Sequence, residues 1–260
     1  MFLTRYMDFY NGIILLHDKK MRLSNPIFFN DPFDCRVSVD DNDNLWKLDM
    51  RARNGAFGYR VPSKALEYNA LIEGCVQNKD REQLKDYRML CFSGEVNQYQ
   101  DVLMWGHYGD SHKGIKITFN EVFYNFIKEN YKFKPICYSN NRITIKYTDN
   151  TSEIKDKIIE SMFCKSKIWH EENEHRMVYD INENSKHIKN GNFYAKDSKV
   201  YSSEYLDVQS EWIKDFSISC NIDKNSEDII RKIAEKEYAG KLSKARLCVV
   251  NYALHYEKVK

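Results

Sequence analysis

Short apolar stretches, several of them alternating with polar residues, recur along this chain and set the class of its fold. Residues 114–119 alternate in the way that a half-buried strand does, and residues 89–93 form an apolar run typical of a buried strand. Short connections between such stretches outnumber helical crossovers, and short connections can join only antiparallel strands. We therefore predict an α+β fold with a mostly antiparallel sheet, continuous or split, flanked by helices.

Helices are predicted where a capping residue precedes apolar residues at helical spacing. Asn120 is placed to cap a helix that follows residues 114–119, and Asn150 with Glu153 has the capping-box pattern for a helix to about Cys164. The other helices are expected at residues 7–17, near 46, 62–77 and 225–240, and the other strands at 2–6, 21–24, 133–138, 142–147 and 246–254, with extended chain at 210–222 and a loop or hairpin at 182–202.

Two further expectations concern connectivity. Residues 133–138 and 142–147 are expected to pair as a hairpin, with Pro135 on a sheet edge because proline cannot donate a ladder hydrogen bond. No internal repeat or flexible linker is visible. One catalytic-type domain is therefore predicted over residues 1–260.

Composition excludes several classes of protein. Hydrophobic residues make up 42% of the chain, which is enough for a sizeable core, and 18 tyrosines and 14 phenylalanines argue against disorder and for pockets with stacking surfaces. Lysine and arginine (40) nearly balance aspartate and glutamate (38), so there is no global basic field, and nucleic acid is neither implied nor excluded. The seven cysteines lack short Cys-x-x-Cys spacing, so reduced thiols are expected rather than a zinc knuckle or a disulfide framework.

The chain also lacks the usual signals for export. Residues 1–6 do not combine a basic region with a long apolar run, as a secretory signal would. No apolar stretch approaches the length of a membrane span. We therefore predict a cytoplasmic location and no membrane partner.

The stretch from Trp169 to Arg176 places three carboxylates and an arginine beside a large aromatic residue. If it is a strand, Glu172, Glu174 and Arg176 share one face. Two carboxylates on one face repel each other unless Arg176, a substrate or a cation lies between them. A solvated strand face is the alternative, but the apolar run at 177–179 favours a strand that enters a core. We therefore predict a functional site here.

A second polar cluster lies at residues 101–114. Its glycines at 106, 109 and 114 would let the backbone approach a ligand closely, and His107, Tyr108 and His112 would supply rings and titratable nitrogens. A tight turn that covers the core is the alternative. The two histidines are five residues apart, which is not the spacing of a metal pair on a helix. We predict a loop that contacts the ligand or shapes the site, without a metal.

A third, turn-rich segment spans residues 28–34. Asn30, Asp31 and the proline that follows are strong turn formers, and the flanking phenylalanines are expected to bury the loop against the body of the fold. Asp31 and Asp34 are expected to cap backbone amides or to orient a basic partner.

Together these motifs resemble a known bacterial family. Phe29-Asn-Asp-Pro-Phe-Asp34, Leu103-Met-Trp-Gly-His-Tyr108 with His112-Lys-Gly114, and Trp169-x-x-Glu172-x-Glu174-x-Arg176 follow Arg5-Tyr6 in the order of the family known as domain of unknown function 2971. The resemblance extends from residue 5 to about 180. Members of that family resemble toxins and phage-defence effectors, and the family is similar to NAD-dependent ADP-ribosyltransferases. It implies an ADP-ribosyltransferase-like fold, NAD as substrate, a nucleic acid or protein as acceptor, and an antitoxin or defence-system partner.

The resemblance also implies roles for individual residues. Breaking the nicotinamide–ribose bond develops positive charge on the sugar, which Glu174 would stabilise, while Glu172 would orient or deprotonate the acceptor. Glu174→Gln is therefore expected to abolish activity and to leave folding stability almost unchanged. No Ser-Thr-Ser-like strand is visible, so Tyr108 and Ser24 both stay candidates for the middle element of the transferase pattern. The predicted binding residues, expected to line one cleft with the glutamates, are Arg5, Tyr6, Asn30, Asp31, His107, Tyr108, His112 and Arg176.

Two other functions fit the same residues. In a metal-dependent nuclease or phosphoesterase, Asp31, Asp34 and the two glutamates would converge on magnesium, and activity would require a divalent metal. In a non-catalytic module, such as an antitoxin or a sensor, the aromatic loops would recognise a nucleotide or a protein. That module would bind its ligand without turnover.

Overall fold

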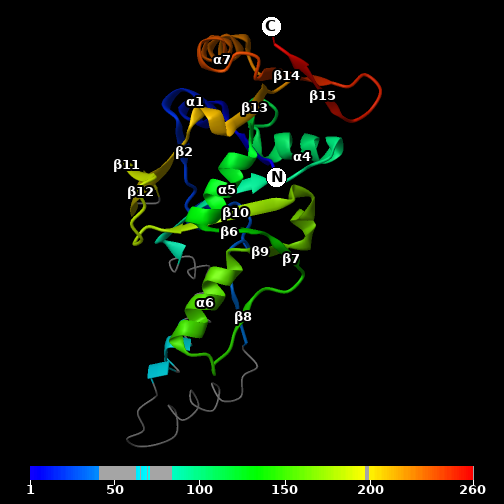
Figure 1. The fold of residues 1–260 in the computed structure, drawn as a ribbon. Coiled ribbons are helices and arrows are strands. Elements are labelled where there is room, and N and C mark those ends of the chain that lie inside the picture. Colours follow the sequence, from blue (N-terminus) through cyan, green and yellow to red (C-terminus); the bar gives the residue numbers. More distant parts are fainter. Residues whose placement is uncertain (41–62, 65, 69, 71–83, 197–198, 260) are drawn as a thin grey trace, which may run out of the picture. The chain divides into compact units, whose positions relative to one another are not determined.

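The structure, a computed structural model, describes residues 1–40, 63–64, 66–68, 70, 84–196 and 199–259. The chain forms two compact units. Unit 1 comprises Met1–Ser24, Arg88–Pro135 and His170–Lys260, and unit 2 comprises Asn25–Tyr87 and Ile136–Trp169. The predicted α+β class is confirmed (Figure 1). The expectation that residues 1–260 act as one catalytic domain stays a prediction.

Unit 1 is built on an eight-stranded sheet with the strand order β15-β14-β13-β5-β1-β4-β10-β6 (Figure 1). The pairings whose register is described are antiparallel, apart from that of β13 with β14, which is parallel. The mostly antiparallel sheet predicted from the short connections is thus confirmed. Its strands are β1 (Leu3–Met7), β4 (Tyr87–Ser93), β5 (Ile115–Phe119), β6 (Lys132–Pro135), β10 (Glu174–Asp180), β13 (Ile213–Ile218), β14 (Leu242–Leu247) and β15 (Leu254–Lys258).

Helices pack on both faces of this sheet. On one face, α1 (Phe9–Asp18), α5 (Glu121–Asn130) and α7 (Lys224–Glu237) bury their apolar residues in one core with strand residues such as Leu3 and Phe216. The contact is close, since a Cβ on Gly12 of α1 would lie 2.4 Å from the Cδ1 atom of Ile115. On the other face, α4 (Gln98–Tyr108) buries Trp105 in a second cluster that includes Tyr6. The sheet is therefore the middle layer of unit 1.

The start of α5 follows its predicted cap, whereas α7 (Lys224–Glu237) starts one residue before the predicted range. The Asn120 side chain accepts a hydrogen bond from the backbone of Phe123 at the start of α5. The helix expected at 225–240 is α7, and its cap is Asp223, whose Oδ1 accepts from the Ser226 N–H at 3.0 Å. Smaller elements complete unit 1: a three-stranded sheet of β2 (Lys20–Arg22), β12 (Lys199–Asp207) and β11 (Ile188–Lys196), and the 3-10 helix η5 (Ser210–Trp212).

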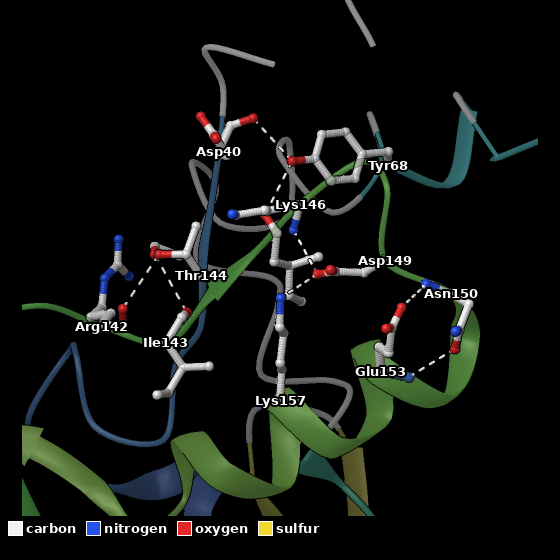
Figure 2. Close-up of polar contacts among 12 residues, drawn as sticks. Asp40, Tyr68, Arg142, Ile143, Thr144, Lys146, Asp149, Asn150, Glu153 and Lys157 are labelled. Atoms are coloured by element: carbon white, nitrogen blue, oxygen red, sulfur yellow. Dashed lines mark hydrogen bonds and ion pairs between the residues drawn. The ribbon is translucent and has the colours of Figure 1, made fainter. Parts of the chain in front are cut away.

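Unit 2 contains two short parallel strand pairs. β3 (Ser38–Val39) pairs with β8 (Thr144–Ile145), and β7 (Cys137–Ser139) pairs with β9 (Cys164–Ser166). The 3-10 helix η1 (Pro26–Phe28) and the helix α6 (Thr151–Ser161) accompany them, and η4 (Lys167–Glu172) leads out of the unit. The capping box of Asn150 and Glu153 is confirmed (Figure 2).

A core cluster of unit 2 contains Val37, Tyr68, Ile145 and Tyr147, and polar contacts lie beside it (Figure 2). The Tyr68 hydroxyl lies 2.9 Å from the Asp40 carbonyl oxygen and 3.1 Å from that of Ile145. Asp149 accepts hydrogen bonds from the Lys146 N–H and the Lys157 ammonium. Burial raises the pKa of this carboxyl, but the two donors outweigh burial and hold it below its ordinary value.

Three predictions about local structure are wrong. Residues 133–138 and 142–147 do not pair with each other, because β6 pairs with β10, β7 with β9 and β8 with β3. Pro135 does lie on a sheet edge, as expected, since β6 ends the strand order. Residues 246–254 are not one strand, because they contain the end of β14, the hairpin turn and the first residue of β15. Residues 101–108 belong to helix α4 rather than to a loop.

Two predicted helices fall wholly or largely outside the described residues. The helix near residue 46 lies outside them altogether. Of the helix at 62–77, residues 63–64, 66–68 and 70 are described, and they are helical. No helix in the described part of the chain is long and apolar enough to cross a membrane.

Candidate functional site

The start of β10 carries a buried ion pair. Glu174 and Arg176 are two residues apart on this strand, so both side chains point to the same face, as predicted. Glu172, which was expected on the same strand face, ends the 3-10 helix η4 before the strand, so that part of the prediction is wrong. Arg176 Nε donates to Glu174 Oε1 at 2.6 Å, and Arg176 Nη2 donates to Oε2 at 3.0 Å. Glu174 is 6% exposed and Arg176 is 1% exposed. A guanidinium inside the protein therefore balances the Glu174 charge through both carboxylate oxygens.

Glu172 is buried beside this pair. It ends η4, is 5% exposed, and accepts a hydrogen bond from the Tyr108 hydroxyl at Oε1 over 2.6 Å. Between the two glutamates, Asn173 adopts the left-handed conformation with a φ of 44°, which asparagine tolerates better than most residues. Its side chain donates to the Glu95 carbonyl at 2.8 Å, and its own carbonyl accepts from the Gly94 N–H. These contacts fix the chain where η4 becomes β10.

Helix α4 supplies the partner of Glu172. The helix forms here because Asn97 and Gln100 make a capping box at its start. Gln100 Nε2 then donates to Glu171 Oε2 at 2.6 Å, and Tyr108 at the last position of the helix reaches Glu172. The structure thus brings the second and third motifs together, although they lie more than sixty residues apart in the sequence.

The two residues of the first motif lie on opposite faces of the sheet. Arg5 shares its face with Leu3 and Met7, and its guanidinium carbon lies 6.0 Å from the centre of the Phe92 ring. Tyr6 points to the α4 face. Burial lowers the pKa of Arg5. The structure therefore does not place Arg5 in one cleft with Tyr108 and Glu174, because neighbouring residues of a strand face opposite ways.

Tyr6 belongs to a buried polar network that the sequence reasoning missed. Its hydroxyl donates to Asp101 Oδ1 at 2.5 Å, the Lys116 ammonium lies 3.1 Å from the same oxygen, and Tyr256 donates to Oδ2. The Trp105 indole N–H donates to the Tyr256 hydroxyl at 2.9 Å. Burial, and then the Asp101 carboxylate, raise the pKa of both tyrosines, whereas burial lowers the pKa of Lys116. The signal for this network in the sequence was Asp101, which shares a helical stripe with the apolar residues Met104 and Trp105.

Contacts with other parts of the chain hold the turn after α4. A Cβ on Gly114 would lie 2.0 Å from the Met7 carbonyl oxygen, so this glycine allows a close backbone contact and its role as a ligand approach is not needed. Asp110, Ser111 and His112 are all left-handed, with φ between 50° and 65°. The His112 carbonyl accepts from the Asn221 N–H at 3.1 Å, and His107 is exposed on α4.

Asn30 and Asp31 lie in unit 2, whereas both glutamates lie in unit 1. Asn30 Oδ1 accepts from the Asp31 N–H at 3.0 Å, and Asp31 Oδ1 accepts from the Phe33 N–H at 2.8 Å. The expected capping role is thus seen for Asp31. Phe33 is 62% exposed, so the expectation that the phenylalanines bury this loop is wrong for that residue. Among the side chains described, no three of histidine, cysteine, aspartate or glutamate are grouped so that they could hold a metal ion.

Comparison with known proteins gives one match. Residues 104–177 match the model of a family described as "Protein of unknown function (DUF2971)". This segment contains Tyr108, Glu172 and Arg176, and it runs from α4 into β10. A search of curated proteins and a search of solved structures found no match. Residues 104–177 are therefore similar to the family that the motifs indicated.

Proposed function

We propose that this protein transfers ADP-ribose from NAD to a macromolecular acceptor, with Glu172 as the carboxylate that faces the reacting sugar. The observation that carries the proposal is the buried Glu172 carboxylate held by the Tyr108 hydroxyl beside the Glu174–Arg176 pair. Two carboxylates and one guanidinium leave one negative charge among these three side chains. A carboxylate in a largely dry site stabilises a developing cation far more than one in water does.

The bidentate contact changes which glutamate carries the main role. Arg176 engages both oxygens of Glu174, so that carboxylate has less charge to offer to a cationic sugar. The Tyr108 hydroxyl donates to Glu172 and orients its carboxylate. We therefore assign the stabilisation of the ribosyl cation to Glu172, and to Glu174 with Arg176 the positioning of the start of β10.

The reaction needs little more from these residues. As the nicotinamide–ribose bond lengthens, positive charge builds on the sugar, and a fixed carboxylate close to it lowers the energy of that state. Tyr108, at the end of α4, keeps Glu172 in one rotamer. The resemblance to phage-defence effectors supports a role in which such an activity arrests the host cell, restrained by an antitoxin or defence-system partner.

The test compares two neighbouring glutamates in the purified full-length chain. Glu172→Gln should lower NAD cleavage and ADP-ribose transfer to cell extract by about 10²–10³-fold, because the charge is lost while the shape is kept. Glu171→Gln is the matched control, since Glu171 lies next in sequence but is half-exposed, and it should stay near wild type. Tyr108→Phe should lower the rate less than Glu172→Gln does.

Two results would refute the assignment. Wild-type activity in a folded Glu172→Gln variant would remove Glu172 from the mechanism. Activity that needs magnesium and consumes no NAD would favour the nuclease alternative instead. Circular dichroism of each variant separates a loss of fold from a loss of chemistry.

A further inference from the structure

A cavity in unit 2 combines positive charge with an exposed aromatic ring. It has a volume of about 290 Å³ and is lined by Phe33, Arg36, residues 139–142 and residues 164–166. β7 and β9 run parallel, with Ser139 level with Ser166, and the lining takes in all of β9 and the carboxyl end of β7.

The charge of the lining selects the ligand class. Arg36, Arg142 and Lys165 contribute three positive charges, and no acidic side chain occurs among the described residues of the lining. Asp34 lies outside the lining, and its Oδ2 is 4.0 Å from the Lys165 ammonium. A phosphate group can accept from several cationic donors at once, so it matches three basic side chains better than a single carboxylate does.

Neutral donors add to this match. The Ser139 hydroxyl oxygen accepts from the Asn141 N–H at 3.0 Å, which orients the hydroxyl and leaves its proton available to a ligand oxygen. Ser166 and the amides at 140 and 141 stand in the same lining. In Figure 2 the Arg142 guanidinium points away from the contacts around Asp149, and it lies 5.7 Å from the centre of the Phe33 ring.

Phe33 is presented to solvent by the turn that precedes it. Asp31 Oδ1 accepts from the Phe33 N–H, and the Asp34 N–H donates to the Asp31 carbonyl, so this turn buries Asp31 and Asp34 while it exposes the ring. A large apolar ring at 62% exposure beside an arginine is a surface on which a planar base can stack. The Asn-Asp-Pro-Phe-Asp motif would then present an aromatic ring to a ligand, a role separate from that of the glutamates in unit 1.

We propose that this cavity binds one nucleoside phosphate unit, with the phosphate on Arg36, Arg142 and Lys165 and the base on Phe33. The volume suits a single nucleotide and is small for a dinucleotide such as NAD. The proposal uses residues of unit 2 only. It therefore stands or falls separately from the proposed transfer reaction.

The experiment measures binding to the full-length chain by calorimetry at low salt. The probes are AMP, ribose 5-phosphate, adenosine and inorganic phosphate. AMP should bind most tightly. Arg142→Glu should weaken AMP and ribose 5-phosphate by about tenfold or more, because a charge-assisted contact becomes a repulsion. Phe33→Ala should weaken AMP by about tenfold and leave ribose 5-phosphate unchanged, because stacking needs the base.

Lys155→Glu is the matched control, because Lys155 is exposed on α6 in the same unit and does not line the cavity. It makes the same change of charge and should leave AMP binding unchanged. Both Arg142 and Phe33 are exposed, so their variants should fold. No binding of AMP, or equal effects of Arg142→Glu and Lys155→Glu, would overturn the proposal. Equal affinity for AMP and inorganic phosphate, with no effect of Phe33→Ala, would overturn the assignment of the base.

A 5′-phosphorylated trinucleotide identifies the source of the nucleotide. Tighter binding of the trinucleotide than of AMP, with the same loss in Arg142→Glu, indicates the end of a nucleic acid. Equal or weaker binding indicates a free mononucleotide. Both results support the cavity as a nucleoside phosphate site.

Discussion

The Glu174–Arg176 pair is expected to be a main determinant of the stability of unit 1. Both side chains are buried, and two hydrogen bonds join the Arg176 guanidinium to the Glu174 carboxylate. Glu174→Gln would remove the carboxylate that engages Arg176 through both of its oxygens, and the loss of one partner of a buried pair costs about 3–5 kcal/mol. That is a large part of the 5–15 kcal/mol typical of a folded domain. The sequence alone predicted almost no loss of stability, so the measurement decides between the two expectations.

A double-mutant cycle measures this directly. The free energies of unfolding in urea are compared for wild type, Glu174→Gln, Arg176→Met and the double variant. Each single change should cost about 3–5 kcal/mol, whereas the double variant should be more stable than either, because neither member of the pair then stays buried without the other. Near-surface Glu171→Gln serves as control and should change the free energy by less than about 0.5 kcal/mol.

Two results would refute this reasoning. A loss of less than about 1 kcal/mol for Glu174→Gln would mean that water or another group compensates Arg176. A double variant whose loss equals the sum of the single losses would mean that the two charges do not depend on each other. The expected instability is also the reason for testing catalysis with Glu172→Gln, since a destabilised Glu174 variant would lose activity for two reasons at once.

The remaining predictions concern the rest of unit 1. Burial lowers the pKa of His175 from its ordinary 6.5. The free energy of unfolding should therefore be highest above pH 6.5 and should fall as the pH drops below it, because the unfolded chain then takes up a proton more readily than the folded one. Urea midpoints from about pH 7 to about pH 5 should show a smaller fall in His175→Phe, and an equal fall in both proteins would contradict the prediction. Asp101→Asn should cost about 3 kcal/mol of unfolding free energy, because it removes the buried carboxylate that the partly buried Lys116 ammonium contacts, whereas exposed Asp156→Asn should cost nearly nothing. Equal urea midpoints for these two aspartate variants would mean that the network around Tyr6 is not a stabilising one.

Local signals in the sequence were sufficient to predict where two helices begin and which side chains share one face of a strand. Asn120 and Asn150 cap the helices that their spacing predicted, because a cap depends on residues within one turn. Glu174 and Arg176 share a face because side chains alternate along any strand. Both properties are fixed by residues close in sequence, so no knowledge of the rest of the fold was needed.

The partners of each strand were decided by the tertiary structure. β6 and β7 look like one arm of a hairpin, yet β6 pairs with β10 and β7 pairs with β9, both from later parts of the chain. An edge-strand proline and a short polar turn are compatible with either arrangement, and only the burial of the whole sheet distinguishes them. The α4 segment is a similar case, because its rings and glycines are compatible with a loop or a helix. The capping box at its start and its packing on the sheet decide for the helix.

The sequence therefore predicted some residues of the candidate site but not the contacts between them. The sequence by itself determined that Glu172, Glu174 and Arg176 lie together, because they occupy one short segment. It could not determine that Tyr108 approaches Glu172 while Arg5 faces away, since that depends on which face of β1 meets α4. Nor could it reveal that Arg176 takes both oxygens of Glu174, because a contact between two side chains depends on how deeply packing buries them.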